Sequence, residues 1–114
     1  MLKRIKADFE HVDERGTITQ LIHSEYKQIN VITSKKGVFR GGHYHKKNGE
    51  AFYIISGSLR VRVNDDEYSF HAGDFFGIEP GDMHSFQFEE DTVLVSMYSD
   101  CVVNPDGTMD MYAE

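Results

Sequence analysis

The sequence contains no tryptophan, only one cysteine and only two prolines. Because Cys101 has no second cysteine to pair with, an internal disulfide is excluded and a reducing compartment is expected. Basic residues are also scarce: 12 Lys and Arg stand against 19 Asp and Glu, for a formal net charge of -7. Phosphate backbones and anionic membranes repel such a chain, so we expect neither nucleic acid nor a membrane as a partner.

Long hydrophobic runs are missing as well. No segment approaches the length needed to cross a bilayer, and residues 1–16 are charged throughout, without the apolar region of a signal peptide. We therefore expect a cytoplasmic protein. A length of 114 residues suffices for a single domain, residues 1–114. We divide it into an N-terminal arm (1–15), a body (16–99) and a C-terminal tail (100–114).

Short segments rich in β-branched and aromatic residues recur along the chain, separated by turn residues. Their alternation of apolar and polar residues predicts strands rather than helices, and no helical period extends far enough to indicate a helix. The arm is expected to carry one short strand around residues 3–7. The remaining predicted strands are 17–22, 28–33, 51–56, 59–63, 68–70, 75–78, 84–88 and 92–97. This spacing predicts an all-β sandwich or barrel.

Two histidines and a glutamate are spaced to meet at one point. His43 and His45 are two residues apart, so on a strand they project from the same face. Glu50 follows a polar loop, residues 46–49, and directly precedes the predicted strand 51–56, which would carry it back beside the histidines. Two imidazoles and a carboxylate suit zinc, iron(II), manganese, nickel or copper, and His84 is the candidate fourth ligand. The other histidines are interpreted as ordinary surface or core residues: His11, His23 and His71.

The same segment carries a family signature. Gly37, His43, His45, Glu50 and Gly57 stand at the spacing of the first cupin motif, which they resemble at every signature position. The resemblance implies a jelly-roll barrel, also called a double-stranded β-helix, with two antiparallel sheets around a metal-containing cavity. It also implies one divalent ion (Zn, Mn, Fe or Ni) held by His43, His45, Glu50 and His84.

A second stretch, residues 73–84, is similar to the second cupin motif and ends on His84. It departs from that motif at two positions. Glu79 stands where proline is common, and Phe88 stands where the motif ends in asparagine. Neither departure removes a predicted ligand. If His84 faces the interior, Phe86 and Phe88 line the same cavity.

A looser resemblance links most of the chain to cupins that act on nucleotide-linked keto-sugars. It rests on residues 13–16, 40–47 and 99–100. Those proteins include the 3,4-ketoisomerases of deoxyhexose pathways and the epimerising cupin domain of some capsule-sugar reductases. The ketoisomerases tend to have glutamine where this chain has Glu50, and are thought to work without metal. Glu50 therefore favours the metal-containing epimerising cupins.

The leading hypothesis is that a small sugar substrate, possibly nucleotide-linked, is isomerised or epimerised beside its ketone through a metal-stabilised enolate. Arg40 is a candidate substrate-binding residue because a guanidinium can contact a phosphate bidentately, although an exposed basic residue is an equal interpretation. No residue is assigned as the catalytic base. The alternatives are a non-catalytic sugar or small-metabolite binding module and an iron-dependent oxygenase. A homodimer is expected from the family and from β-edges that need covering.

Overall fold

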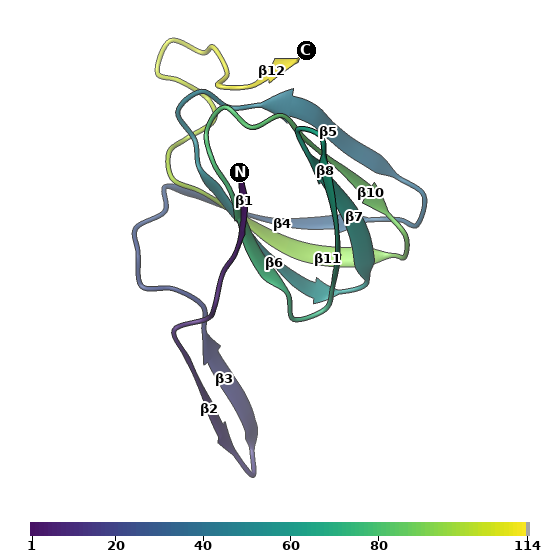
Figure 1. The fold of residues 1–114 in the computed structure, drawn as a ribbon. Coiled ribbons are helices and arrows are strands. Elements are labelled where there is room, and N and C mark those ends of the chain that lie inside the picture. Colours follow the sequence, from purple (N-terminus) through teal and green to yellow (C-terminus); the bar gives the residue numbers. More distant parts are fainter. Residues whose placement is uncertain (114) are drawn as a thin grey trace.

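The computed structural model describes residues 1–113, and its regular secondary structure in that range is β (Figure 1). The strands are β1 (Leu2–Arg4), β2 (Phe9–Asp13), β3 (Gly16–Gln20), β4 (Gln28–Ser34), β5 (Phe39–Tyr44), β6 (Glu50–Ser56), β7 (Ser58–Val63), β8 (Asp66–His71), β9 (Phe75–Ile78), β10 (His84–Phe88), β11 (Thr92–Tyr98) and β12 (Tyr112–Ala113). The predicted all-β class is confirmed.

Two five-stranded antiparallel sheets face each other across the interior of the barrel (Figure 1). The first sheet has the order β1-β9-β6-β11-β4, and the second has the order β12-β5-β10-β7-β8. This is the jelly-roll arrangement expected from the sequence motifs. The arm contributes β1 to the first sheet and the tail contributes β12 to the second, so both termini pair with strands of the body.

Aromatic rings fill part of the space between the sheets. The Phe70 and Phe76 rings stack with their centroids 4.1 Å apart, and Phe52 lies 5.2 Å from Phe76 and 5.0 Å from Phe86. The other buried members of this cluster are Leu2, Ile54, Leu59, Val61, Val63, Ile78, Phe88 and Leu94. The inward-facing residues of β7 are those that the alternating sequence pattern predicts, because its arginines lie on the opposite, exposed face.

A hairpin of β2 and β3 projects away from the barrel (Figure 1). Its register runs from Phe9 opposite Gln20 to Asp13 opposite Gly16. The sequence did not predict β2, because its side chains are exposed or only half-buried and so leave no apolar face to recognise. Hydrogen bonding to β3, rather than burial, defines this strand.

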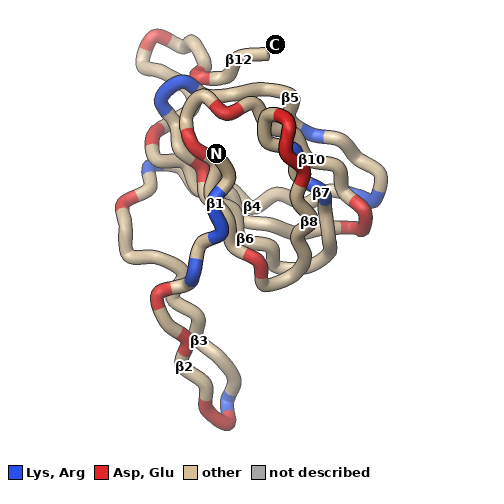
Figure 2. The backbone as a smooth tube through the Cα atoms, viewed as in Figure 1, with Lys and Arg blue, Asp and Glu red and all other residues tan. Residues whose placement is uncertain are grey.

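Charged residues are spread over the exterior. In Figure 2 the acidic segments lie at turns around the barrel and at the tip of the β2–β3 hairpin, so the net charge of -7 is distributed rather than gathered on one face. Within residues 1–113 there is no helix of the length and apolar character needed to cross a membrane.

Two glycines of the first motif differ in their surroundings. Gly57, between β6 and β7, has φ of +92°, and a Cβ there would lie 2.5 Å from the Asp91 carbonyl oxygen and closer still to Thr92 Oγ1. Gly37 has a similar φ of +87° but no atom within 4 Å of the equivalent point. The pair therefore separates the effect of backbone conformation from that of steric contact.

We expect Gly37→Ala to lower the free energy of unfolding by about 1–2 kcal/mol, because an L-residue is disfavoured at positive φ. Gly57→Ala carries the same conformational effect and overpacks its site, which adds about 1–3 kcal/mol. Urea denaturation of both variants measures the difference. Equal losses would show that the contact between residue 57 and the turn at residues 91–92 does not matter.

Candidate metal centre

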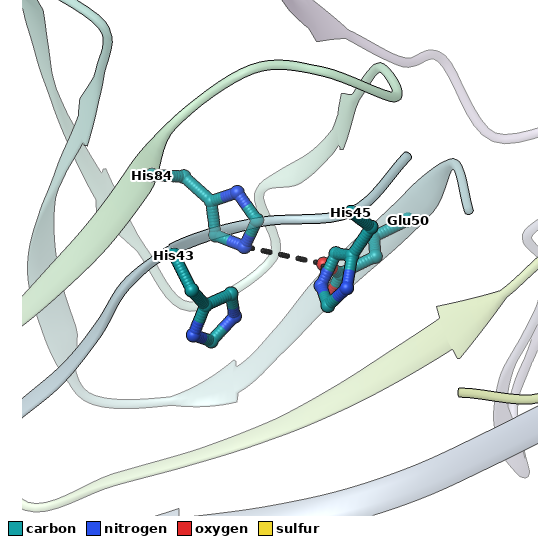
Figure 3. A group of neighbouring side chains, drawn as sticks. All are labelled: His43, His45, Glu50 and His84. Carbon is teal, nitrogen blue, oxygen red and sulfur yellow. Dashed lines mark ion pairs between the residues drawn. The ribbon is translucent and has the colours of Figure 1, made fainter. Parts of the chain in front are cut away.

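The four predicted ligands lie together at one end of the barrel interior (Figure 3). Each offers one donor atom, and these atoms all lie within 4.8 Å of one another. His43 comes from β5, His84 begins β10, Glu50 begins β6, and His45 directly follows β5. The set therefore joins both sheets, because β5 and β10 belong to one and β6 belongs to the other.

A bulge places His43 beside His84. The register of β5 against β10 shifts between His84, opposite His43, and Ser85, opposite Gly41. Gly41 has φ of +95°, and a Cβ there would meet the His84 carbonyl oxygen at 2.9 Å. Adjacent glycines such as Gly41 and Gly42 are typical of a bulge or of a close approach between backbones.

Two of the histidines are held by backbone carbonyls. His45 Nδ1 donates to the Asp110 carbonyl oxygen at 2.5 Å, and His84 Nδ1 donates to the Asp82 carbonyl oxygen at 2.9 Å. A carbonyl only accepts, so the proton of each neutral ring resides on Nδ1 and the lone pair on Nε2. Both Nε2 atoms face Glu50 Oε1, at 2.6 Å from His45 and 3.2 Å from His84. Fixing a ring through its second nitrogen is the usual arrangement for a metal-binding histidine.

The contact between His45 and Glu50 is short but is not a hydrogen bond. Neither His45 Nε2 nor Glu50 Oε1 has a hydrogen-bond partner with acceptable geometry among the described residues, although both atoms are buried. Both atoms belong to the group of donor atoms that lie within 4.8 Å of one another. Buried polar atoms without partners are rare in folded proteins, and a cation between them would satisfy both. The donor set therefore fits a divalent ion.

The charge states also suit a cation. Burial opposes ionisation of Glu50, but its contacts with His45 and His84 outweigh burial and lower the pKa of Glu50 to about 2. Burial, together with the neighbouring histidines, lowers the pKa of His43 to about 4. At neutral pH the site thus offers one carboxylate and a neutral His43, whose lone pair is available for ligation.

A cavity of about 210 Å³ is lined by three of the four proposed ligands, His43, Glu50 and His84. It is lined on the apolar side by Ile32, Phe52, Phe86, Phe88 and Leu94. The expectation that Phe86 and Phe88 would line a cavity together with His84 is confirmed. Arg40 lies at the edge of the cavity, where its guanidinium donates to Ser34 Oγ at 2.8 Å and to the Thr33 carbonyl at 3.3 Å. The role of Arg40 in substrate binding stays a prediction.

Sequence reasoning missed two residues of the site. Tyr98 lines the cavity and lies opposite Glu50 on the neighbouring strand, with its ring edge-on to His45 at 5.5 Å. Its strand had been predicted only as far as residue 97, although strand parity places Tyr98 on the face of Leu94. Burial and the adjacent Glu50 carboxylate raise the pKa of Tyr98. Asp110 had no recognisable signal, because its contacts lie more than sixty positions away in the sequence.

The family model described as Cupin domain matches residues 30–99, which is more than half of the chain. The chain belongs to the cupin family. In sequence, this cupin is 38% identical over 56 residues to a UDP-2-acetamido-2,6-beta-L-arabino-hexul-4-ose reductase of Pseudomonas aeruginosa. That match covers 48% of the cupin and only 15% of the length of the reductase.

Solved structures resemble the cupin over most of its length. A 3,4-ketoisomerase from Thermoanaerobacterium thermosaccharolyticum, solved as a double mutant in complex with TDP, is 28% identical with a TM-score of 0.73. The alignment covers 87% of the cupin and 80% of that chain. A 3,4-ketoisomerase from Helicobacter canadensis has a TM-score of 0.79 at 22% identity, with coverage of 99% and 90%. At 22% identity, the similarity to the Helicobacter canadensis structure supports the fold alone.

We expect Glu50→Gln to weaken binding of a divalent ion, because the amide removes the only negative charge among the four donors. Loss of a residue that supports a metal ligand usually lowers metal affinity by roughly 10–100-fold. Loss of the ligand itself should lower the affinity at least as much. Isothermal titration calorimetry of metal-free protein with Zn²⁺ measures the affinity of each variant. Glu25→Gln, an exposed glutamate outside the site, is the matched control. Unchanged affinity in Glu50→Gln would remove Glu50 from the ligand set.

Proposed function

We propose that this cupin isomerises or epimerises a keto-sugar that is linked to a nucleotide. The observation that supports it best is the set of convergent donors beside a small cavity, in a chain that aligns along most of its length with a ketoisomerase that binds TDP. A hydrogen next to a ketone is acidic enough to remove when the oxygen that gains charge is stabilised.

His43, His45, Glu50 and His84 would hold one divalent ion, for which zinc, manganese, iron(II) and nickel all suit the donors. When bound, the ion supplies positive charge next to a substrate carbonyl. The protein contributes rigidity, because backbone carbonyls orient the rings of His45 and His84 before any ligand arrives.

The size of the cavity restricts how the substrate is placed. Its volume of about 210 Å³ is smaller than the roughly 300–1,000 Å³ of pockets that enclose drug-sized ligands. The cavity would accommodate one sugar ring, so the nucleotide of a linked substrate would extend past the edge where Arg40 lies. A guanidinium there is suited to a phosphate, provided that it exchanges its contacts with Ser34 and Thr33.

Proton transfer requires a group that is not a metal ligand. Among the described cavity-lining residues outside the ligand set, Arg40 and Tyr98 are the ones with ionisable side chains. The raised pKa of Tyr98 keeps its hydroxyl protonated at neutral pH, which makes it a proton donor rather than a base. Because Tyr98 lies opposite Glu50, this proton donor is next to the four proposed metal ligands.

Incubation with a nucleotide-linked 4-keto-6-deoxyhexose in deuterated water should introduce deuterium at C3, detected by NMR and mass spectrometry. Tyr98→Phe should lower kcat by about 10²–10⁴, the usual contribution of general acid–base catalysis. Tyr26→Phe, which lies outside the cavity, serves as the control.

Other results would favour the alternative functions. Tight binding of the sugar without exchange or turnover would support a non-catalytic binding module. Oxygen consumption by the iron-loaded protein would support an oxygenase. Absence of deuterium at C3, with binding intact, would contradict proton abstraction at that carbon.

We also propose that the protein is a homodimer. Ile29 and Val31 on the edge strand β4 are 62% and 67% exposed, next to half-buried Val93 and Val95 on β11. The β2–β3 hairpin exposes Val12 and Ile18 in the same way. A second copy of the chain would cover these apolar side chains and the unpaired edge of β4.

Val31→Asp should shift the protein toward monomer in sedimentation equilibrium, because the carboxylate would be buried in the interface without a partner. Val103→Asp is the matched control, since Val103 is a similarly exposed valine on the tail, at 55% against 67% for Val31. If the wild-type protein sediments as a monomer, the proposal of a homodimer is wrong. If both variants stay dimeric, β4 is not the interface.

A further inference from the structure

The tail folds back to form a small hairpin of its own. Val103 bridges to Met109, the Asp110 amide donates to the Val102 carbonyl at 2.8 Å, and Asn104 and Thr108 close the turn. Met109 and Met111 of this tail are exposed. Asp110 between them is only 2% exposed, so the tail buries an acidic residue as well as Val102.

The Asp110 carboxylate receives four hydrogen bonds from one loop. The backbone amides of Lys46, Lys47 and Asn48 donate to it at 2.8, 3.1 and 3.1 Å, and Asn48 Nδ2 donates at 3.0 Å. Successive amides that point at one anion form a concave anion-binding site. Burial opposes ionisation of Asp110, but these hydrogen bonds outweigh burial and lower its pKa.

Further contacts connect the same loop to the tail and to the end of β11. Asn48 is also buried, and its Oδ1 accepts from the Asp100 amide at 2.8 Å. The Gly49 amide donates to Ser99 Oγ at 3.0 Å. Lys47 Nζ contacts Asn104 Oδ1 at 2.5 Å. The loop is thus held along its length by residues 99–110.

This loop is the connection between two of the proposed ligands. Residues 46–49 are the only residues between His45 and Glu50, so fixing the loop limits where both side chains can lie. Asp110 also acts directly on the first of them, because its backbone carbonyl accepts the Nδ1 proton of His45 at 2.5 Å. One residue therefore determines the loop conformation and the tautomer of a ligand.

We infer that Asp110 is a positioning residue for the metal centre: its carboxylate fixes the loop at residues 46–49 and its carbonyl fixes the His45 ring. The inference rests on the proposed metal site. It makes the tail part of the site rather than an appendage, and it assigns Asp110 no contact with substrate or metal.

Asp110→Asn tests the inference. The amide group replaces an acceptor with a donor that faces backbone N–H groups, so the loop should move away and the Asp110 carbonyl should leave His45. We expect Zn²⁺ affinity to fall by roughly 10–100-fold, the usual result of losing such a support. The Co²⁺-loaded variant should show altered visible absorption bands, because the ligand geometry changes.

Asp106→Asn is the matched control. Asp106 lies on the same tail hairpin, and among residues 1–113 its side chain accepts hydrogen bonds from Thr108 and not from the loop at residues 46–49. Its variant should retain wild-type Zn²⁺ affinity and the wild-type Co²⁺ spectrum. An Asp110→Asn variant that folds, binds Zn²⁺ with unchanged affinity and keeps the Co²⁺ spectrum would overturn the inference.

Metal-free wild-type protein provides a second measurement that does not depend on the variant. The amide hydrogens of Lys46, Lys47 and Asn48 should exchange slowly, and nitrogen NMR should place the His45 proton on Nδ1. Fast exchange of these amides, or a proton on Nε2, would contradict the inference even if Asp110→Asn fails to fold. A wild-type protein that binds no metal would refute the metal site, while exchange and tautomer would still decide whether Asp110 positions the loop.

Discussion

The structure depends on a carboxylate that is placed between two sheets and away from water. The Glu50 residue is 5% exposed, and a buried charge without compensation is very unfavourable. His84 and His45, on the side of the opposite sheet, bring their Nε2 atoms to within 3.2 and 2.6 Å of Glu50 Oε1, and a cation held by these atoms would supply the compensation. This one interaction explains why the two sheets must meet at a fixed separation at this end of the barrel, and why the surrounding residues are polar.

The two ends of the interior are held by different forces. Stacked phenylalanine rings, centred on Phe52, Phe70 and Phe76, tie the sheets together by burial of apolar area and by ring contacts. The end that carries the donors has histidines, Tyr98 and a network of hydrogen bonds to the tail. The apolar part consists mainly of hydrocarbon side chains, whereas the polar part keeps donors in place for a ligand. The cavity lies where these two environments meet.

Much of this could be predicted from the sequence because the signals are local. His43 and His45 share a face by strand parity, Gly41 and Gly42 indicate the bulge, and the alternation in β7 identifies its inward side. The fold class followed from the motif that contains these residues. What escaped prediction depends on contacts between distant segments. β2 has no buried face to recognise. Tyr98 can be assigned to the site only when β11 is known to pair with β6, because that pairing places it opposite Glu50. The Asp110 carboxylate accepts hydrogen bonds from backbone amides. Because every residue except proline has such an amide, no residue type in the sequence identifies these partners.

The long sequence separation between the loop at residues 46–48 and Asp110 has a consequence for assembly. Contacts at such separation form late in folding, since closing the intervening chain costs entropy that only a folded body repays. The strands from β6 to β11 lie between the two segments in the sequence. We therefore expect the proposed ion to be bound after the barrel has formed, so that selection among competing cations would be made by a preorganised pocket and not by a nascent polypeptide.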